Sequence, residues 1–243
     1  MAWSAPQSLW LLLRDPSTFF EEHEPAATFP VAAGVVVALA VAAGLSTLLL
    51  GSMLAGAIDG TVTMDNPDRP PEWVCDGHGP DSSFDGDCDE PETIERDAGS
   101  LVSEAVTDYL GYMVVAPFVM WLLAGIVLFA AGRLAAGSPS VTGTFALAGW
   151  AALPEFFRLT VGLVALQAVL SDLTITNLEG SPEVIEAAFA PIQPFLALAT
   201  VLTVLWQWYL LTGGLEHEAN LTRSAAATAV GVPLGVLLLV ALI

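Results

Sequence analysis

Five long stretches of this chain contain no charged residue, and their lengths and positions constrain the fold more than any other feature. Asp, Glu, Lys and Arg make up 13% of the sequence, about half their usual share in a soluble domain. The uncharged stretches run from Glu24 to Asp59, Asp108 to Arg133, Arg158 to Asp172, Glu186 to Glu216, and Arg223 to Ile243. A helix needs about 20 apolar residues to cross a bilayer, and lipid tolerates no unsatisfied backbone group. The pattern therefore predicts an all-α integral membrane protein, a bundle of five transmembrane helices.

The bounds of the five spans follow from the same stretches. The predicted spans are residues 29–54, 109–132, 153–171, 188–212 and 224–243. The third is long enough only if it begins at Leu153, where Glu155 and Arg158 then share a face and can pair at the lipid boundary. Residues 141–152 predict a short interfacial helix before this span, or else an extension of it past a kink at Pro154. In the last span, small residues at Gly231 and Gly235 favour close helix packing.

The arginines predict the orientation. With a cytoplasmic N-terminus, four arginines lie inside and two lie in a long external loop: Arg14, Arg133, Arg158 and Arg223 against Arg69 and Arg96. The protein is thus expected in the cell membrane as a multi-pass protein with an extracytoplasmic C-terminus. Residues 1–27 form a cytoplasmic or interfacial segment, and residues 28–243 form the membrane domain.

Two shorter features refine this topology. Trp206, Trp208 and Tyr209 are expected at the inner headgroup level, because aromatic residues favour the membrane interface. A short helix is expected to begin at Asp15, with Pro16 at its first position and Thr18 and Glu21 at capping-box spacing.

The external loop, residues 59–108, is strongly acidic. It holds 15 of the 26 acidic residues of a chain whose net charge is −20, so nucleic acid is excluded as a partner. Both cysteines also lie there, and Cys75 and Cys88 are expected to form a disulfide in an oxidising space. Oxygen-bearing residues follow the spacing of a calcium-binding loop, with Gly86 at the turn, and a solvated acidic loop is the alternative. These candidate calcium ligands are Asp81, Ser83, Asp85, Asp87, Asp89 and Glu92.

A second set of possible metal ligands flanks the first and fourth spans. Glu22 and His23 precede the first span, and Glu216 and His217 follow the fourth, so the topology puts all four on the cytoplasmic face. They are candidates for a divalent metal site, and the alternative is that they solvate helix ends. No HExxH, GxSxG or P-loop pattern and no intramembrane acid pair occurs in the sequence. The chain is therefore expected not to be an enzyme.

Several short motifs occur in a characteristic order. They are Arg14-Asp-Pro16 with Phe19-Phe20; Asp108-Tyr-Leu-Gly-Tyr112 with Pro117; Gly132-Arg133, Ser140-Val-Thr-Gly-Thr, Gly149-Trp and Pro154; and Trp206-Gln-Trp-Tyr, Gly214-Leu-Glu-His217 and Leu221-Thr-Arg223-Ser-Ala225. This order resembles the Yip family, five-span membrane proteins named for interacting with Ypt/Rab GTPases. The resemblance implies a five-span bundle with a cytoplasmic N-terminus and a role in membrane trafficking or shaping, although prokaryotic members have no Rab system. The lysine-free, Asp-rich composition looks like that of a salt-adapted archaeal protein.

Three functions remain open at this point. The first is a non-enzymatic scaffold or adaptor that contacts the lipid bilayer and binds membrane proteins or copies of itself. The second is a transporter or channel subunit, which a continuous polar cavity among Gln167, Gln193 and Gln207 would favour. The third is an extracytoplasmic calcium-responsive sensor.

Overall fold

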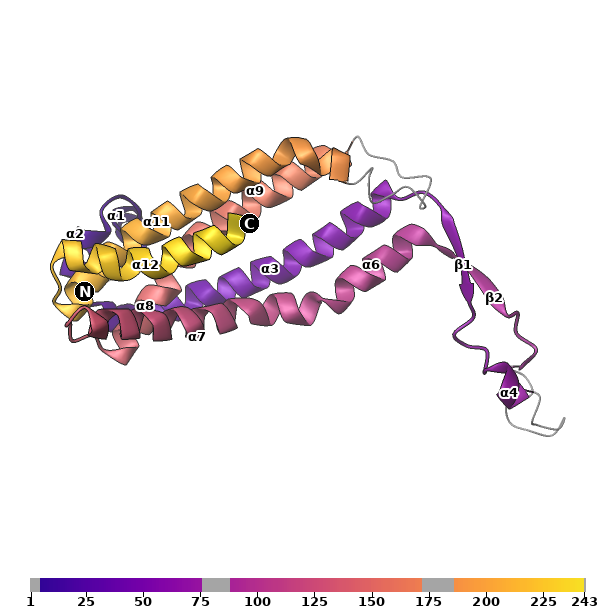
Figure 1. Ribbon diagram of the computed structural model, residues 1–243, viewed down its shortest axis with the longest axis horizontal. Coiled ribbons are helices and arrows are strands. Elements are labelled where there is room, and N and C mark those ends of the chain that lie inside the picture. Colours follow the sequence, from indigo (N-terminus) through magenta and orange to yellow (C-terminus); the bar gives the residue numbers. More distant parts are fainter. Residues whose placement is uncertain (1–4, 76–87, 172–185, 243) are drawn as a thin grey trace.

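The computed structural model describes residues 5–75, 88–171 and 186–242, and it confirms the all-α membrane bundle (Figure 1). Within these residues, five helical segments are long and apolar enough to cross a membrane: Pro25–Ala57, Ala98–Leu134, Val141–Leu170, Glu186–Ala219 and Arg223–Ala241. The helices are α1 (Ala5–Arg14), α2 (Pro16–Glu22), α3 (Phe29–Ala57), α4 (Glu72–Cys75), α6 (Ala98–Asp108), α7 (Leu110–Leu134), α8 (Val141–Trp150), α9 (Leu153–Leu170), α11 (Gln193–Ala219) and α12 (Arg223–Leu242). Short 3-10 turns occur at η1 (Pro25–Thr28) and η2 (Ala190–Ile192).

The long helices form two neighbouring groups. In the first, α3 packs along α6 and α7, and in the second, α11 packs between α9 and α12. Helix α8 joins the groups at the end of the bundle where the N-terminus lies, because it contacts α3, α7 and α11 together. Helices α1 and α2 cover the same end, with α2 against α11.

Helix α8 is the short helix expected before the third span, but it is not laid on the outside of the bundle. Seven of its ten residues are buried, and Trp150 is fully inaccessible. Ala151 and Ala152 separate it from α9, which begins beside Pro154. Neighbouring helices therefore enclose α8 on several sides, and it does not lie on the membrane surface as an amphipathic helix would.

Two helix bounds differ from the sequence expectation. Helix α11 continues to Ala219 instead of ending at residue 212, and Asn220 ends it in the left-handed conformation (φ 53°), with its N–H on the Glu216 carbonyl. Helix α6 begins eleven residues before the predicted second span, because Asp97 caps it by accepting a hydrogen bond from Ser100 N at 2.7 Å. The helical part of the chain therefore extends beyond the purely apolar stretches at both places.

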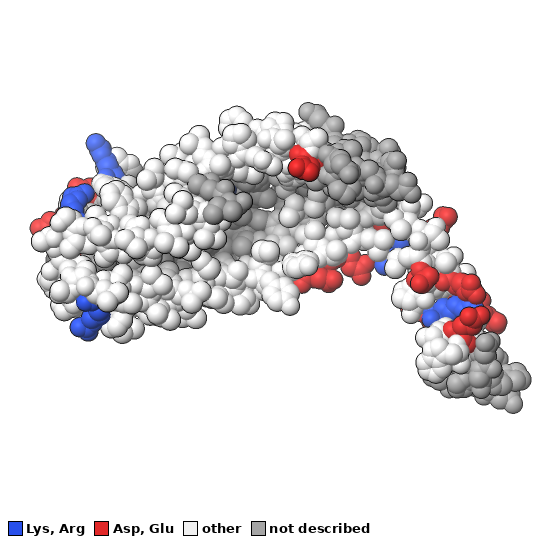
Figure 2. All heavy atoms as spheres, in the orientation of Figure 1, with Lys and Arg blue, Asp and Glu red and all other residues white. Residues whose placement is uncertain are grey.

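A two-stranded hairpin lies between α3 and α6 and projects from the opposite end of the bundle (Figure 1). In it β1 (Thr61–Asp65) pairs antiparallel with β2 (Thr93–Asp97), and Val62 lies opposite Arg96. The acidic sequence of this segment predicts a loop, so the two strands differ from the sequence expectation. Exposed and half-buried side chains alternate along both strands, as the period of two in a strand requires. The hairpin carries much of the acidic surface visible in Figure 2.

The buried core lies at the end of the bundle that bears the N-terminus. We call this region the packed end, and it comprises α1, α2, η1, α8, the last turn of α7 with residues 135–140, residues 209–219 of α11 and the first residues of α12. Its inaccessible side chains include Leu12, Phe19, Leu147, Trp150 and Leu215. Farther along the bundle, large apolar side chains are exposed, such as Leu45 of α3 and Ile126 of α7. Exposed apolar surface of this extent on a five-span protein is the surface that contacts the bilayer.

Candidate functional site: the packed end of the bundle

Buried aromatic side chains from two separate motifs meet at the packed end. Phe19 contacts Phe20 edge-on, and the Phe19 ring centroid lies 5.9 Å from that of Trp150. The Trp150 indole Nε1–H donates to Thr28 Oγ1 at 2.9 Å, and this hydroxyl donates to the Pro25 carbonyl at 2.8 Å. The polar atom of the largest buried side chain is therefore satisfied, which a buried indole requires. The Phe-Phe and Gly-Trp motifs thus serve one shared core.

Glycines at this end let helices approach each other closely. A Cβ at Gly149 would lie 2.8 Å from the Ala32 carbonyl oxygen, and one at Gly213 would lie 2.9 Å from the Ser17 backbone nitrogen. A Cβ at Gly132 would lie 2.9 Å from Pro139 Cγ. These distances are shorter than ordinary carbon contacts, so each position requires a residue without a side chain. Small residues are the usual means by which membrane helices pack.

Ser140, the first residue of its motif, and Glu218, which directly follows the Gly214-Leu-Glu-His217 motif, form one hydrogen-bonded junction. Ser140 is the N-cap of α8, where its Oγ accepts from Gly143 N at 3.0 Å. Glu218 Oε1 in turn accepts from Ser140 N at 2.8 Å and from Ser140 Oγ at 2.6 Å. A Cβ at Gly143 would overlap this carboxylate. A carboxylate at a helix N-terminus is favourable, so Glu218 locks α11 to the start of α8.

The structure brings Glu155 and Arg158 together on the first turns of α9. Arg158 Nε donates to Glu155 Oε2 at 2.7 Å. The other carboxylate oxygen, Oε1, accepts from Gln207 Nε2 at 2.8 Å, and Gln207 also donates to the Ala151 carbonyl at 3.0 Å. Gln207 therefore links the Glu155–Arg158 ion pair of α9 to α11. Trp206 and Trp208 flank Gln207 in the sequence.

The four possible ligands of a divalent metal lie at the packed end but face separate partners. The His217 ring Nε2 lies 3.2 Å from Ser17 Oγ, while the His23 ring stacks on Phe19 and its Nδ1 lies 3.0 Å from the Phe19 carbonyl oxygen. Glu22 is exposed, and Glu216 Oε2 is buried with no hydrogen-bond partner among the described residues. Across residues 5–75, 88–171 and 186–242, no three His, Cys, Asp or Glu side chains are grouped to hold a metal ion.

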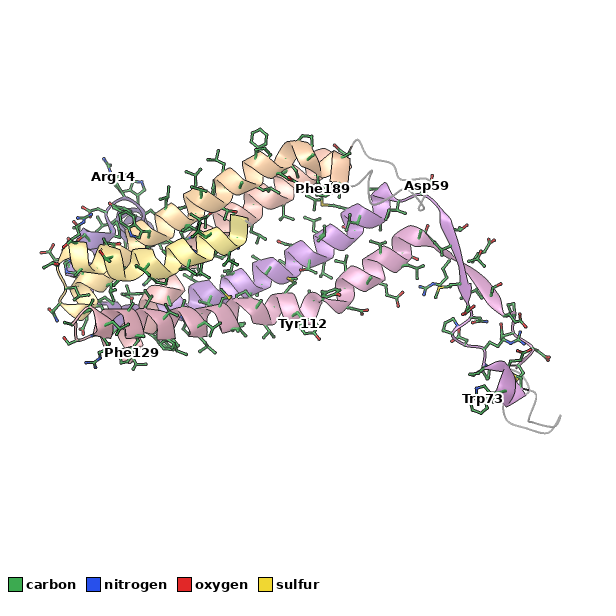
Figure 3. All side chains as sticks on the ribbon, in the orientation of Figure 1. Arg14, Asp59, Trp73, Tyr112, Phe129 and Phe189 are labelled. Atoms are coloured by element: carbon green, nitrogen blue, oxygen red, sulfur yellow. A yellow bond between two sulfur atoms is a disulfide. The ribbon has the colours of Figure 1, made fainter. Side chains whose placement is uncertain are left out.

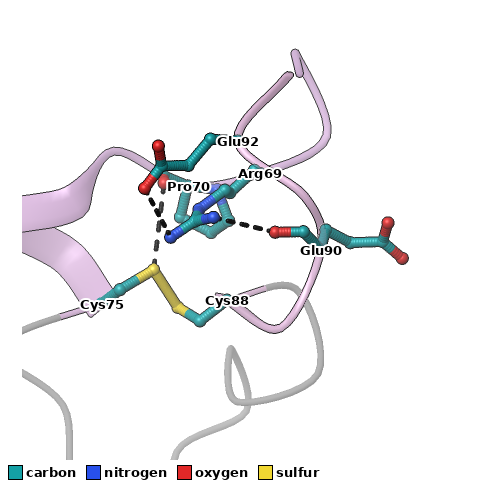
Figure 4. The surroundings of a disulfide bond; sticks show 6 residues. All are labelled: Arg69, Pro70, Cys75, Cys88, Glu90 and Glu92. Atoms are coloured by element: carbon teal, nitrogen blue, oxygen red, sulfur yellow. Dashed lines mark hydrogen bonds and ion pairs between the residues drawn. A yellow bond between two sulfur atoms is a disulfide. The ribbon is translucent and has the colours of Figure 1, made fainter. Parts of the chain in front are cut away.

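The disulfide between Cys75 and Cys88 is present at the outer part of the hairpin region (Figure 4). Beside it, Arg69 pairs with Glu92 at 3.7 Å and donates to the Glu90 carbonyl at 2.9 Å. Four of the candidate calcium ligands, Asp81, Ser83, Asp85 and Asp87, lie outside the described residues. Of the other two, Glu92 faces Arg69 and Asp89 is exposed. Calcium binding stays a prediction.

The two glycines of the last span have different surroundings. A Cβ at Gly231 would lie 3.2 Å from Trp208 Nε1, whereas one at Gly235 would meet nothing within 4 Å. Trp208 Nε1–H also donates to the Ala227 carbonyl at 3.0 Å. Gly231 therefore accommodates the indole that ties α11 to α12, and Gly235 lies outside this contact.

The sequence did not predict the Ser140–Glu218 junction, and it predicted the start of α2 at Asp15 but a capping box at Thr18 and Glu21. Asp15, not Thr18, is the N-cap of α2: its carboxylate accepts from Thr18 N at 3.2 Å and from Thr18 Oγ1 at 2.8 Å. The side-chain bond from Thr18 is the main cause that lowers the pKa of Asp15, and the backbone bond adds to it. An Asp followed by Pro at N1 is a recognisable cap signal, but a partner 78 residues away, as for Ser140 and Glu218, leaves no local signal.

A comparison with known protein families identifies the same family that the motifs indicate. The sequence model of the Yip1 domain matches residues 10–243, which covers every element of the packed end from Trp10 onward and all five spans. No curated protein and no solved structure matches the chain significantly. The match extends over nearly the whole chain and confirms the resemblance carried by the motifs. The protein belongs to the Yip1 domain family of multi-pass membrane proteins.

Proposed function

We propose that this protein is a non-enzymatic membrane adaptor that organises partner proteins or copies of itself in the bilayer. The observation that carries the proposal is that residues of the Yip-family motifs pack the helices together at one end of the bundle. Phe19, Gly149 and Trp150 hold helices together at one end of the bundle, and Ser140 of a further motif binds Glu218 there. Motif residues that pack helices together support a scaffold, because a scaffold acts through the surfaces that its packed helices present.

The three glutamines of the spans lend little support to a transporter. Gln167 and Gln193 are exposed on the outside of α9 and α11, and Gln207 is engaged with Ala151 and Glu155. A solute path needs polar groups that converge on a shared cavity. The adaptor therefore remains the better supported of the two functions.

We also propose a cytoplasmic N-terminus in the cell membrane. Arg14 ends α1, Arg133 lies in the last turn of α7 and Arg223 begins α12, all at the packed end. Figure 2 shows acidic side chains gathered over the hairpin and the neighbouring end of the bundle. Arginine in short loops marks the cytoplasmic side. In a Cys75→Ser/Cys88→Ser background, a membrane-impermeant maleimide should label Thr63→Cys in intact cells and Ser138→Cys only after permeabilisation. The reverse labelling would place the packed end outside.

Site-specific photocrosslinking tests the adaptor function. A photoreactive residue at Leu134, which is 89% exposed at the packed end, should give one discrete protein adduct in native membranes in repeated preparations. The matched control carries the probe at Trp73, which is 76% exposed on the hairpin region, and should not give this adduct. The purified protein in proteoliposomes should conduct no ion or solute above empty vesicles. Flux in that assay, or repeated recovery as a stoichiometric subunit of a transport complex, would contradict the proposal.

A further inference from the structure

A shallow, open cavity lies where α1, α11 and α12 meet at the packed end. Its volume is about 500 Å³, and its lining consists of Trp10, Leu11, Arg14, Asp15, Tyr209 and Arg223. Two of the six basic residues of a chain with net charge −20 therefore line one cavity. Figure 3 shows Arg14 at this end of the bundle, far from the hairpin.

The arginines of this protein fall into two classes. Three form ion pairs: Arg69 with Glu92, Arg96 with Glu104, and Arg158 with Glu155. Among the residues that the structure describes, Arg14, Arg133 and Arg223 have no carboxylate within ion-pair distance, and two of these three line the cavity.

Among the described residues that line the cavity, Asp15 is the only acidic one, and its carboxylate is already engaged. Both of its oxygens accept hydrogen bonds from Thr18 at the start of α2. Asp15 and Arg223 attract each other without forming a direct pair. The cavity therefore keeps an excess of positive charge and two guanidinium groups with donors to spare.

The cavity also has the aromatic surroundings of a membrane interface. The Arg14 guanidinium lies 4.9 Å from the centroid of the Trp10 ring, and Tyr209 OH donates to the Arg14 carbonyl at 3.1 Å. Next to it, Leu9, Trp10 and Leu13 expose one apolar face of α1. An apolar face beside arginine and aromatic residues is typical of a helix at headgroup depth.

We infer that this cavity binds the phosphate of an anionic phospholipid headgroup, with Arg14 and Arg223 as the anion-binding residues. Guanidinium groups suit phosphate because they donate two parallel hydrogen bonds to its oxygens. The apolar face of α1 provides contact for the acyl chains below the headgroup. Lipid binding here does not depend on a protein partner, so it stands or falls separately from the adaptor function.

The test is a lipid titration of the delipidated, detergent-solubilised full-length protein, read by native mass spectrometry. Wild-type protein should retain phosphatidylglycerol in preference to phosphatidylcholine. Arg14→Gln/Arg223→Gln should weaken phosphatidylglycerol binding by about thirtyfold, and Arg223→Gln alone by about fivefold. The matched control is Arg133→Gln, which removes an unpaired arginine of the same end that stacks on Phe129 outside the cavity. This control should bind as wild type does.

Several results would overturn the inference. One is equal retention of the two lipids by wild-type protein, and another is an equal loss in the Arg133→Gln control. A third measurement adds inorganic phosphate in the millimolar range in place of lipid. If it raises the melting temperature of wild-type protein while phosphatidylglycerol does not, the site recognises a free anion and the lipid assignment fails. Far-UV circular dichroism and gel filtration check that each variant is folded, and the single variant serves if the double variant is not.

Discussion

Gly149→Ala tests whether the packed end is a close-packed helix junction. A Cβ at Gly149 would lie 2.8 Å from the Ala32 carbonyl oxygen and 2.9 Å from its carbonyl carbon, at least about 0.5 Å inside ordinary contact distance. The obstacle is main chain, which cannot rotate away, so α3 and α8 have to separate. Overpacking costs about 1–3 kcal/mol, and the backbone obstacle favours the upper part of this range. The higher helix propensity of alanine returns about 1 kcal/mol, so the variant should be about 2 kcal/mol less stable.

The matched control is Gly162→Ala in α9, where a Cβ would meet nothing within 4 Å. Only helix propensity acts there, so this variant should be more stable by up to about 1 kcal/mol. The free energy of unfolding is measured by titrating sodium dodecyl sulfate into mixed micelles and following helical circular dichroism. The two variants should differ by about 3 kcal/mol. If Gly149→Ala is as stable as Gly162→Ala, the close approach of α3 and α8 is absent and the reasoning fails.

Three further predictions concern other parts of the protein. Trp150→Phe removes the indole donor and leaves a small void, so the free energy of unfolding should fall by about 2 kcal/mol in the same titration; an unchanged value would show that this donor stabilises nothing. Hydrogen bonds from Thr18 lower the pKa of Asp15 in the folded protein, so its contribution to stability is present above the unfolded pKa and is lost as pH falls through the folded pKa. Asp15→Asn keeps the cap but should flatten the loss of stability below about pH 4, and identical acid-unfolding curves would contradict this. Reducing the Cys75–Cys88 disulfide should destabilise the hairpin region by roughly 3 kcal/mol, so hydrogen exchange should quicken in β1 and β2 only, and quickening across α3 and α11 would be contrary to it.

The sequence was sufficient for the spans because their signal is local. A run without charge has to be helical in lipid, whatever it packs against, and α3, α7 and α9 begin and end within a few residues of the expected positions. The start of α2 was predictable for the same reason, because Asp15 and Pro16 are adjacent. Only the capping partner was misassigned.

The arrangement of the packed end was not predictable from the sequence, because hydropathy does not distinguish burial by lipid from burial by protein. Leu147 and Leu45 are equally apolar, yet Leu147 is inaccessible and Leu45 is 63% exposed. The burial of α8 and the Ser140–Glu218 junction depend on contacts between distant segments. The strands of the hairpin were missed because their alternation is short and lies inside a strongly acidic segment.

The exposure pattern of α11 indicates where the bilayer ends. One face of α11 is exposed from Phe195 to Trp208, through Leu198, Leu202 and Leu205, whereas Leu210, Leu211 and Leu215 are buried by protein. Gln193 to Trp208 extends about 24 Å, close to the thickness of the hydrocarbon core, which is about 30 Å. The remaining turns of α11 need α2 and α8 to cover them because lipid tails no longer do. Gln207, and with it the Glu155 pair, then lies at the boundary, where a charged group keeps its hydration. The close-packed core and the arginine cavity accordingly belong to the headgroup and aqueous zone, where a lipid headgroup or a partner protein is within reach.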